Sequence, residues 1–126
     1  KDNIVIRDFY NANRTSMEHA LQNLADIGKK YPQKKTLAIL GDMFELGDYS
    51  LQDHQYIVDT SCELSIDQIL LVGSNFAQTQ HDNIQSFSTV DDIINYLQNQ
   101  NIGDSSILLK ASNGMNFQKI FNEVHW

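Results

Sequence analysis

The chain has 126 residues, a length that fits one domain with one hydrophobic core. Hydrophobic residues make up 41% of it and charged residues 20%, which is the composition of a globular protein. The net charge of −7 argues against nucleic-acid binding, because such a surface needs clustered Lys and Arg. Apolar runs fall well short of the ~20 residues of a membrane span, so we expect no membrane insertion.

Strand-like and helix-like segments alternate from the start of the chain. A first strand is expected at 4–7. The capping sequence 15–18, with Thr15 as the N-cap and Glu18 three residues on, predicts a helix that runs to about Lys29. A second strand is expected at 36–40, followed by a long loop at 41–49. Ser50 then opens a second cap-like sequence and a helix.

The same alternation continues to the end of the chain. Strands are expected at 68–72, at 84–87 and at 106–109, with a short helical turn at 75–79. Helices are expected after the capping sequence 88–91 and from about Met115 onward. Continuous apolar runs such as 69–72 fit parallel strands that are covered on both faces. Right-handed crossovers then predict a single α/β domain over 1–126, a three-layer α/β/α sandwich with a mostly parallel, Rossmann-like sheet.

The single cysteine and the first residues of the sequence bear on the cellular compartment. Cys62 is the single cysteine, and one cysteine makes neither an internal disulfide nor a metal site. Because it lies in an apolar-periodic stretch, we expect it to be buried. Lys1-Asp2-Asn3 does not resemble a signal peptide, and no initiator Met precedes it. We therefore expect a cytoplasmic protein, or a domain cut from one.

Three polar segments, 8–13, 41–47 and 110–114, each follow an apolar strand. If the strands are parallel, all three lie at the carboxyl edge of the sheet, where open α/β sheets bind ligands. In the first segment, the Asp8 carboxylate could accept the hydroxyls of a ribose, and Tyr10 offers an aromatic face. Asn11 and Asn13 offer paired amide donors and acceptors. The alternative is a turn that satisfies its own backbone groups.

The second and third segments carry charges between small residues. Asp42 and Glu45 lie between two glycines, and Met43 in the same loop needs either burial or a partner. The alternative is a loop that packs on itself. His54 follows this loop and is the one histidine that we connect with the site.

Lys110 could bind phosphate or carboxylate as a point charge. Ser112 and Asn113 precede a helix whose free N–H groups attract anions. The alternative is a lysine in solvent, with Ser or Asn capping the helix. No phosphate-binding loop, no dinucleotide fingerprint and no serine-nucleophile motif is present, and no two histidines have metal-ligand spacing.

All three segments resemble motifs of one family. Residues 8–17, DFYNANRTSM, are similar to D-x-Y-N-A-N-P-x-S-M, and residues 40–47, LGDMFELG, with His54 downstream, to L-G-D-M-x-E-L-G followed by His. Residues 109–115, LKASNGM, are similar to V-K-G-S-R-G-M. Order and spacing agree with the C-terminal domain of the Mur ligases of bacterial peptidoglycan synthesis, in the branch that adds D-Ala-D-Ala. Arg14 stands where the family usually has Pro, and 111–113 reads Ala-Ser-Asn instead of Gly-Ser-Arg.

The resemblance implies a fragment of a three-domain, ATP-dependent cytoplasmic ligase. Such an enzyme phosphorylates the carboxylate of UDP-MurNAc-tripeptide, and the amine of D-Ala-D-Ala then attacks the acyl-phosphate. ATP and magnesium would be held mainly by the central domain, and the C-terminal domain, inert alone, would close over ATP and bind the dipeptide. Its partners would be these small molecules and the N-terminal and central domains. The resemblance assigns two sets of residues: Asp8, Tyr10, Asn11 and Asn13 to the nucleotide, and Asp42, Met43, Glu45, His54, Lys110, Ser112 and Asn113 to the dipeptide.

Two other classes of protein share parts of this pattern. A phosphoacceptor receiver domain also has acidic residues after strand one and a Lys-Ala pair after strand five. It needs an aspartate at the end of strand three, where this chain has Val72-Gly73-Ser74. A free-standing binding or scaffolding domain is the other alternative.

Overall fold

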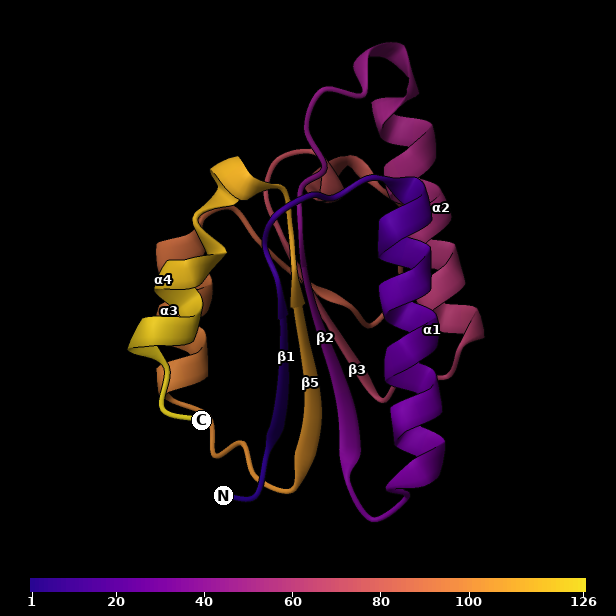
Figure 1. Ribbon diagram of the computed structural model, residues 1–126. Helices are drawn as coiled ribbons and strands as arrows, with labels where there is room; N and C mark the ends of the chain where they lie inside the picture. The colour runs from indigo at the N-terminus through magenta and orange to yellow at the C-terminus, as the bar shows by residue number, and fades with distance from the viewer.

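A five-stranded parallel sheet with helices on both faces forms the structure, a computed structural model that describes residues 1–126 (Figure 1). The strand order is β1-β5-β2-β3-β4, and every neighbouring pair is parallel. The strands are β1 Ile4–Asp8, β2 Lys35–Gly41, β3 Gln68–Val72, β4 Gln85–Phe87 and β5 Ser105–Lys110. The helices are α1 Arg14–Lys30, α2 Ser50–Glu63, α3 Val90–Gln98 and α4 Phe117–Glu123. Three 3₁₀ turns are η1 Gly47–Tyr49, η2 Phe76–Gln78 and η3 Asn113–Met115.

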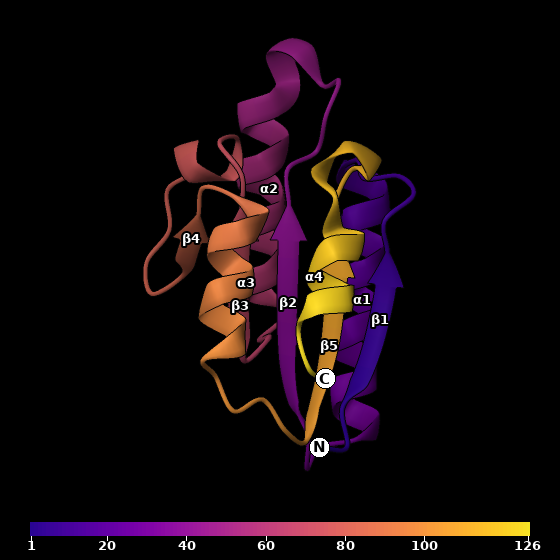
Figure 2. The ribbon, with the colours of Figure 1, turned by 90° about the vertical axis from the view of Figure 1, so that its left-hand side faces the viewer.

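The helices form two layers that enclose the sheet. Figures 1 and 2 show α1 and α2 on one face and α3 and α4 on the other. Each face has its own apolar core, one containing Leu21 of α1 and the other Ile93 of α3. All six residues of β5 are buried, because its side chains alternate between these two cores. The predicted three-layer α/β/α sandwich is confirmed.

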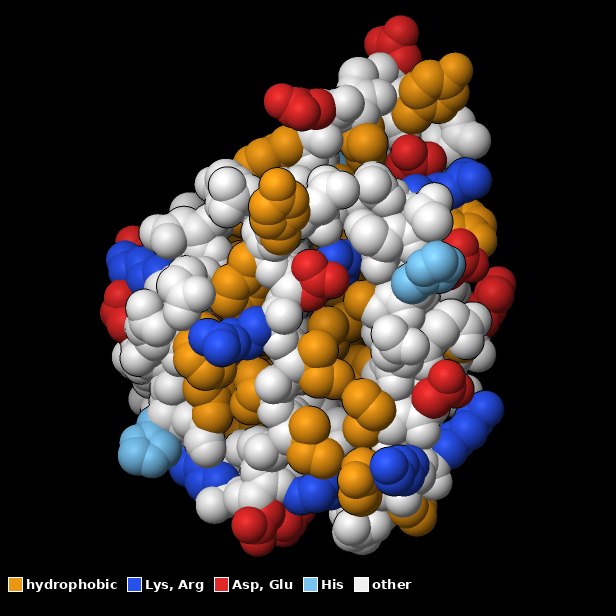
Figure 3. All heavy atoms as spheres, in the orientation of Figure 1, with side chains coloured by type: hydrophobic (Ala, Val, Ile, Leu, Met, Phe, Trp, Pro, Cys, Tyr) orange, Lys and Arg blue, Asp and Glu red, His pale blue; other side chains and the backbone are white.

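One side of the sheet ends at β1, which only β5 borders. The first three residues of β1 are half-buried, whereas the inner strands are buried almost throughout. Figure 3 views the molecule from this side and shows apolar side chains gathered between the two helical layers. No helix combines the length and the apolar character that crossing a membrane requires.

Two of the predicted N-caps are wrong. The N-cap of α1 is Asn13, not Thr15. Asn13 Oδ1 accepts from Ser16 N at 2.9 Å, and Ser16 Oγ accepts from Asn13 N at 3.0 Å. Asn followed three residues later by Ser makes the same reciprocal pair as the predicted box, two residues earlier. Ser50 does not cap α2, because η1 runs directly into that helix.

Two further predictions are corrected near the end of the chain and on α2. The last helix begins at Phe117 and not near Met115, because Asn116 has a left-handed φ of 60° and separates η3 from α4. Cys62 is exposed and not buried. The buried stripe of α2 includes its neighbour Ser61 instead, so Cys62 falls on the solvent side of the helix.

Candidate functional site

The three motif loops meet at the carboxyl edge of the sheet. β5 lies between β1 and β2. The loops after β1 and β2 lead to α1 and α2 on one face, whereas the loop after β5 leads to α4 on the other (Figure 1). The direction of the connections therefore reverses on both sides of β5. Such a switch point is where open α/β sheets form ligand crevices.

Of the cavities at this edge, two adjoin each other. The first, of about 200 Å³, receives residues from all three loops: Tyr10, Asn11, Ala12, Phe44, Glu45, Ser112, Asn113 and Gly114. We call it the first hollow. The second hollow, of about 470 Å³, lies between the ends of β2 and β3 and the residues around the starts of α3 and α4. It is lined by Asp42, Phe44, Gly73, Ser74, Ser88, Thr89, Val90, Asp91, Gly114, Met115, Asn116 and Lys119.

Phe44 and Gly114 line both hollows and form a wall between them. A Cβ atom added to Gly114 would lie 3.0 Å from Cε2 of the Phe44 ring. The ring therefore packs directly on the backbone at Gly114, and a side chain at this position would push against it. This contact keeps the two hollows adjacent but separate.

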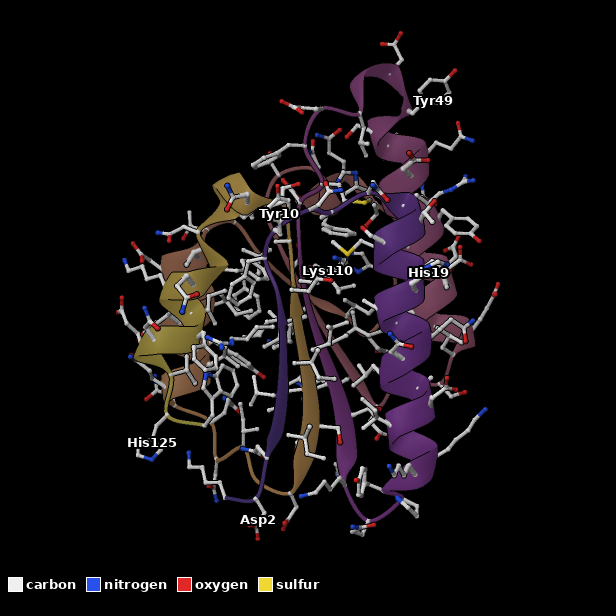
Figure 4. All side chains as sticks on the ribbon, viewed as in Figure 1. Asp2, Tyr10, His19, Tyr49, Lys110 and His125 are labelled. Carbon is white, nitrogen blue, oxygen red and sulfur yellow. The ribbon has the colours of Figure 1, made fainter.

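Lys110 is buried and ties the loop after β1 to β5. Its side chain is 1% exposed, and its Nζ lies 2.6 Å from Oδ2 of Asp8. The same amine donates to the carbonyl oxygen of Asn11 at 2.8 Å. Figure 4 shows Lys110 in the interior, below the edge at which Tyr10 lies. Lys110 thus holds the loop that presents Tyr10, which is itself 88% exposed.

Asp42 is buried and shapes the turn after β3. Its two carboxylate oxygens accept from Asn75 N and Phe76 N, each at 2.9 Å. A Cβ atom at Gly73 would lie 2.4 Å from this carboxylate, and Gly73 has a φ of +117°. Glycine is the residue that accepts both the close approach and the positive φ.

Met43 and His54 anchor the loop after β2 from inside. The Met43 side chain lies in the core, and its N–H donates to His54 Nε2 at 3.0 Å. Because Nε2 accepts, the ring proton is on Nδ1, which donates to the carbonyl oxygen of Ser50 at 2.6 Å. The His54 ring also meets the ring of Phe76 edge to face.

Ser112 joins the loop after β5 to the loop after β2. Its Oγ accepts from Phe44 N at 2.8 Å, and its own N–H donates to the carbonyl oxygen of Asp42 at 3.2 Å. Glu45 and Asn113 are exposed beside it, and Glu45 has a left-handed φ of 64°. Both residues line the first hollow.

The residues predicted for the site fall into two groups. Tyr10, Asn11, Glu45, Ser112 and Asn113 line the first hollow, and Asp42 lines the second. The others support the loops: Asp8 pairs with Lys110, Asn13 caps α1, and Met43 and His54 are buried. No group of three or more His, Cys, Asp or Glu side chains is arranged to hold a metal ion.

Sequence reasoning missed one ion pair in the second hollow. Lys119 Nζ lies 2.6 Å from Oδ1 of Asp91. The hydrogen bond from Lys119 to Asp91 raises the pKa of the lysine above its ordinary value of 10.5, so the amine is charged at neutral pH. No motif surrounds either residue, and nothing in the local sequence distinguishes them from other surface charges.

A doubly wound parallel sheet with loops gathered at its switch point defines a ligand-binding α/β domain. A family model described as "Mur ligase, glutamate ligase domain" matches residues 1–113, and the chain belongs to this family. The family predicted from the three motifs is thereby confirmed.

Curated relatives are ligases of one kind. The UDP-N-acetylmuramoyl-tripeptide–D-alanyl-D-alanine ligase of Rickettsia prowazekii is 31% identical over 126 residues, covering 92% of this chain and 26% of that protein. The Bacillus subtilis ligase of the same name is 28% identical over 131 residues, covering 95% and 27%. The chain thus spans about a quarter of the length of these relatives.

Solved structures share the fold. A MurF ligase from Thermotoga maritima in complex with ADP superposes with a TM-score of 0.79 at 20% identity, covering 98% of this chain and 28% of that one. A MurF structure from Acinetobacter baumannii superposes with a TM-score of 0.74 at 30% identity, covering 93% and 26%.

Proposed function

We propose that this chain is the C-terminal domain of an ATP-dependent bacterial ligase that joins D-Ala-D-Ala to UDP-MurNAc-tripeptide through an acyl-phosphate. The observation that carries the proposal is the meeting of the three family motifs around the first hollow. The names of the relatives and the ADP complex of the T. maritima structure support it. In the whole enzyme, which would work in the cytoplasm, the domain closes over ATP and receives the dipeptide.

The nucleotide is assigned to the loop after β1. Lys110 binds one oxygen of the Asp8 carboxylate. The Asp8 side chain remains 42% exposed, so it can still accept hydrogen bonds from ribose hydroxyls. Tyr10 presents an exposed ring and Asn11 an exposed amide at the first hollow. Asn13 contributes indirectly, because its side chain caps α1 and thereby fixes where the loop after β1 ends.

The amine substrate is assigned to the loops after β2 and β5. Glu45, Ser112 and Asn113 face the first hollow and can contact the reacting end of the dipeptide. Asp42 lines the neighbouring hollow. Met43 and His54 are buried and act on the dipeptide through the loop after β2, whereas the buried Lys110 acts through the loop after β1 that it holds. Such positioning matters because a ligase gains rate by holding two reactants in one geometry.

Phosphoryl transfer from ATP is assigned to the other domains of the enzyme. The chain has no phosphate-binding loop and no metal-holding cluster. ATP supplies the phosphoryl group, and this domain's part is to bind the outer portion of the nucleotide, to place the dipeptide amine and to exclude water on closure. The isolated chain is expected to be inert and to bind nucleotide with a dissociation constant on the order of millimolar, because only part of each pocket is present.

A chimera tests the proposal. The matching segment of the B. subtilis relative is replaced by residues 1–126, and phosphate release is measured with ATP, UDP-MurNAc-tripeptide and D-Ala-D-Ala. We expect release that depends on all three substrates, and none from the chain alone. Turnover by the isolated chain, or ATP binding in the micromolar range, would contradict the proposal and favour a self-contained nucleotide module.

A further inference from the structure

The second hollow has the size of a small-molecule site and, unlike the first, a cation in its lining. Its volume of about 470 Å³ is within the usual range for small-molecule sites. It is lined by one cation, Lys119, by two carboxylates, Asp42 and Asp91, and by hydroxyl side chains such as Ser74 and Ser88. The first hollow has no Lys or Arg in its lining. None of the roles assigned to the first hollow uses Lys119 or Asp91.

We infer that the second hollow holds the carboxyl-terminal half of the incoming dipeptide, with Lys119 Nζ binding its carboxylate. The inference deepens the proposed function and rests on it. A dipeptide that enters as a nucleophile needs its carboxylate held while its amine stays free. Phe44 and Gly114 line both hollows, so the two hollows share a border across which a dipeptide held in the second would reach toward the first.

Lys119 is the cation available for this task. Lys110 is buried and fully engaged with Asp8 and Asn11, whereas the Lys119 side chain is 38% exposed and its partner Asp91 75% exposed. An ammonium group has three donors, so Lys119 can keep its hydrogen bond to Asp91 and donate to a substrate carboxylate as well. In the free protein, Asp91 holds the amine at the rim of the hollow. Asn113, in the adjacent loop, offers an amide and no charge.

Nuclear magnetic resonance titration of the ¹⁵N-labelled chain tests the site. The probes are D-Ala-D-Ala, the same dipeptide with a C-terminal amide, and ADP. D-Ala-D-Ala should shift signals of Ser74, Ser88 and Asn116, and the amidated dipeptide should bind about tenfold more weakly, because a hydrogen bond to a charged group is lost. ADP should shift signals of Tyr10 and Asn11.

Variants of Lys119 make the test specific to the carboxylate. Lys119→Gln should lower affinity for D-Ala-D-Ala about tenfold and abolish the preference for the free carboxylate. Lys119→Arg should retain that preference, and Lys29→Gln, which removes an exposed lysine of α1, should change nothing. The preference for carboxylate over amide is a readout that a purely structural role of Lys119 would not alter.

The outcomes separate this inference from the proposed function. If D-Ala-D-Ala and its amide bind equally to the unaltered chain, or if Lys119→Gln keeps the preference, the assignment of Lys119 is wrong. Dipeptide shifts centred on Tyr10 and Asn113 would overturn the second hollow while the proposed function stands. If neither ADP nor either dipeptide perturbs the carboxyl edge, the inference fails, and the chimera assay decides on the proposed function separately.

Discussion

Replacing Lys110 by Met tests how much the site depends on one buried amine. The variant loses the hydrogen bond from Nζ to the carbonyl oxygen of Asn11, which is worth about 1.5–3 kcal/mol for a charged donor. The ion pair with Asp8 adds only about 0–1 kcal/mol, because that carboxylate is 42% exposed. Met fills a similar volume and removes a buried polar group, which offsets part of the loss.

We expect a net destabilisation of about 1–3 kcal/mol, concentrated in the loop after β1. Urea unfolding measures the total, and amide hydrogen exchange over residues 8–13 locates it. In Lys110→Met, the affinity for ADP and the protection of residues 8–13 from hydrogen exchange should fall together. The control Lys29→Met should leave both unchanged. In a double-mutant cycle with Asp8→Asn, the two changes should couple by about 0.5 kcal/mol or more, since they remove one contact.

One pattern of results would refute this reasoning. In that pattern, Lys110→Met unfolds at the same urea concentration as the unaltered chain and binds ADP with the same affinity, but it binds D-Ala-D-Ala more weakly. Lys110 would then contact the dipeptide directly, as its place in the motif alone suggested. The burial of its amine would have to be relieved when the substrate binds.

Gly73→Ala should destabilise the chain by about 2–4 kcal/mol in urea unfolding, because the new Cβ meets the Asp42 carboxylate at a left-handed φ. Gly103→Ala is the matched control and should stay within about 0.5 kcal/mol, and equal effects would count against the strain argument. The hydrogen bond that Tyr56 donates to Glu18 raises the pKa of the phenol, so its stabilising effect is present below the ordinary pKa and disappears as pH rises through the raised one. Glu18→Gln should lower the pKa of Tyr56 in a ¹³C resonance titration, and an unchanged value would show that the hydrogen bond is not its cause.

The positions of the strands and the meeting of the loops were predictable from the sequence. β3 has the predicted bounds, because a short continuous apolar run flanked by polar residues fits a strand that is covered on both faces. The three polar segments meet because parallel strands bring their carboxyl ends to one edge. Both consequences follow from periodicity and chain direction, which are local properties.

The partners of the charged residues were not predictable in the same way. Lys110 and Asp42 were expected to face a ligand, yet one binds Asp8 and the other binds two backbone amides after β3. A lysine at a strand end has the same local sequence whether its amine meets solvent or a buried carboxylate. Lys119 shows the converse, because a surface lysine of a helix becomes part of a cavity only through the packing of α4 beside α3.

The position of β5 in the sheet determines how late during synthesis the site can fold. Of the five strands, β5 is the last to be synthesised, yet it is the sole neighbour of β1, and the contact from Lys110 to Asn11 joins residues 99 positions apart. While the chain grows, β2 and β3 can pair early, but the segment 4–8 has nothing to pair with. Contacts of such long separation form late, because the intervening chain must first be closed into a loop. A nascent chain stalled before Ser105 would therefore keep much of one helical layer and lack the first hollow altogether.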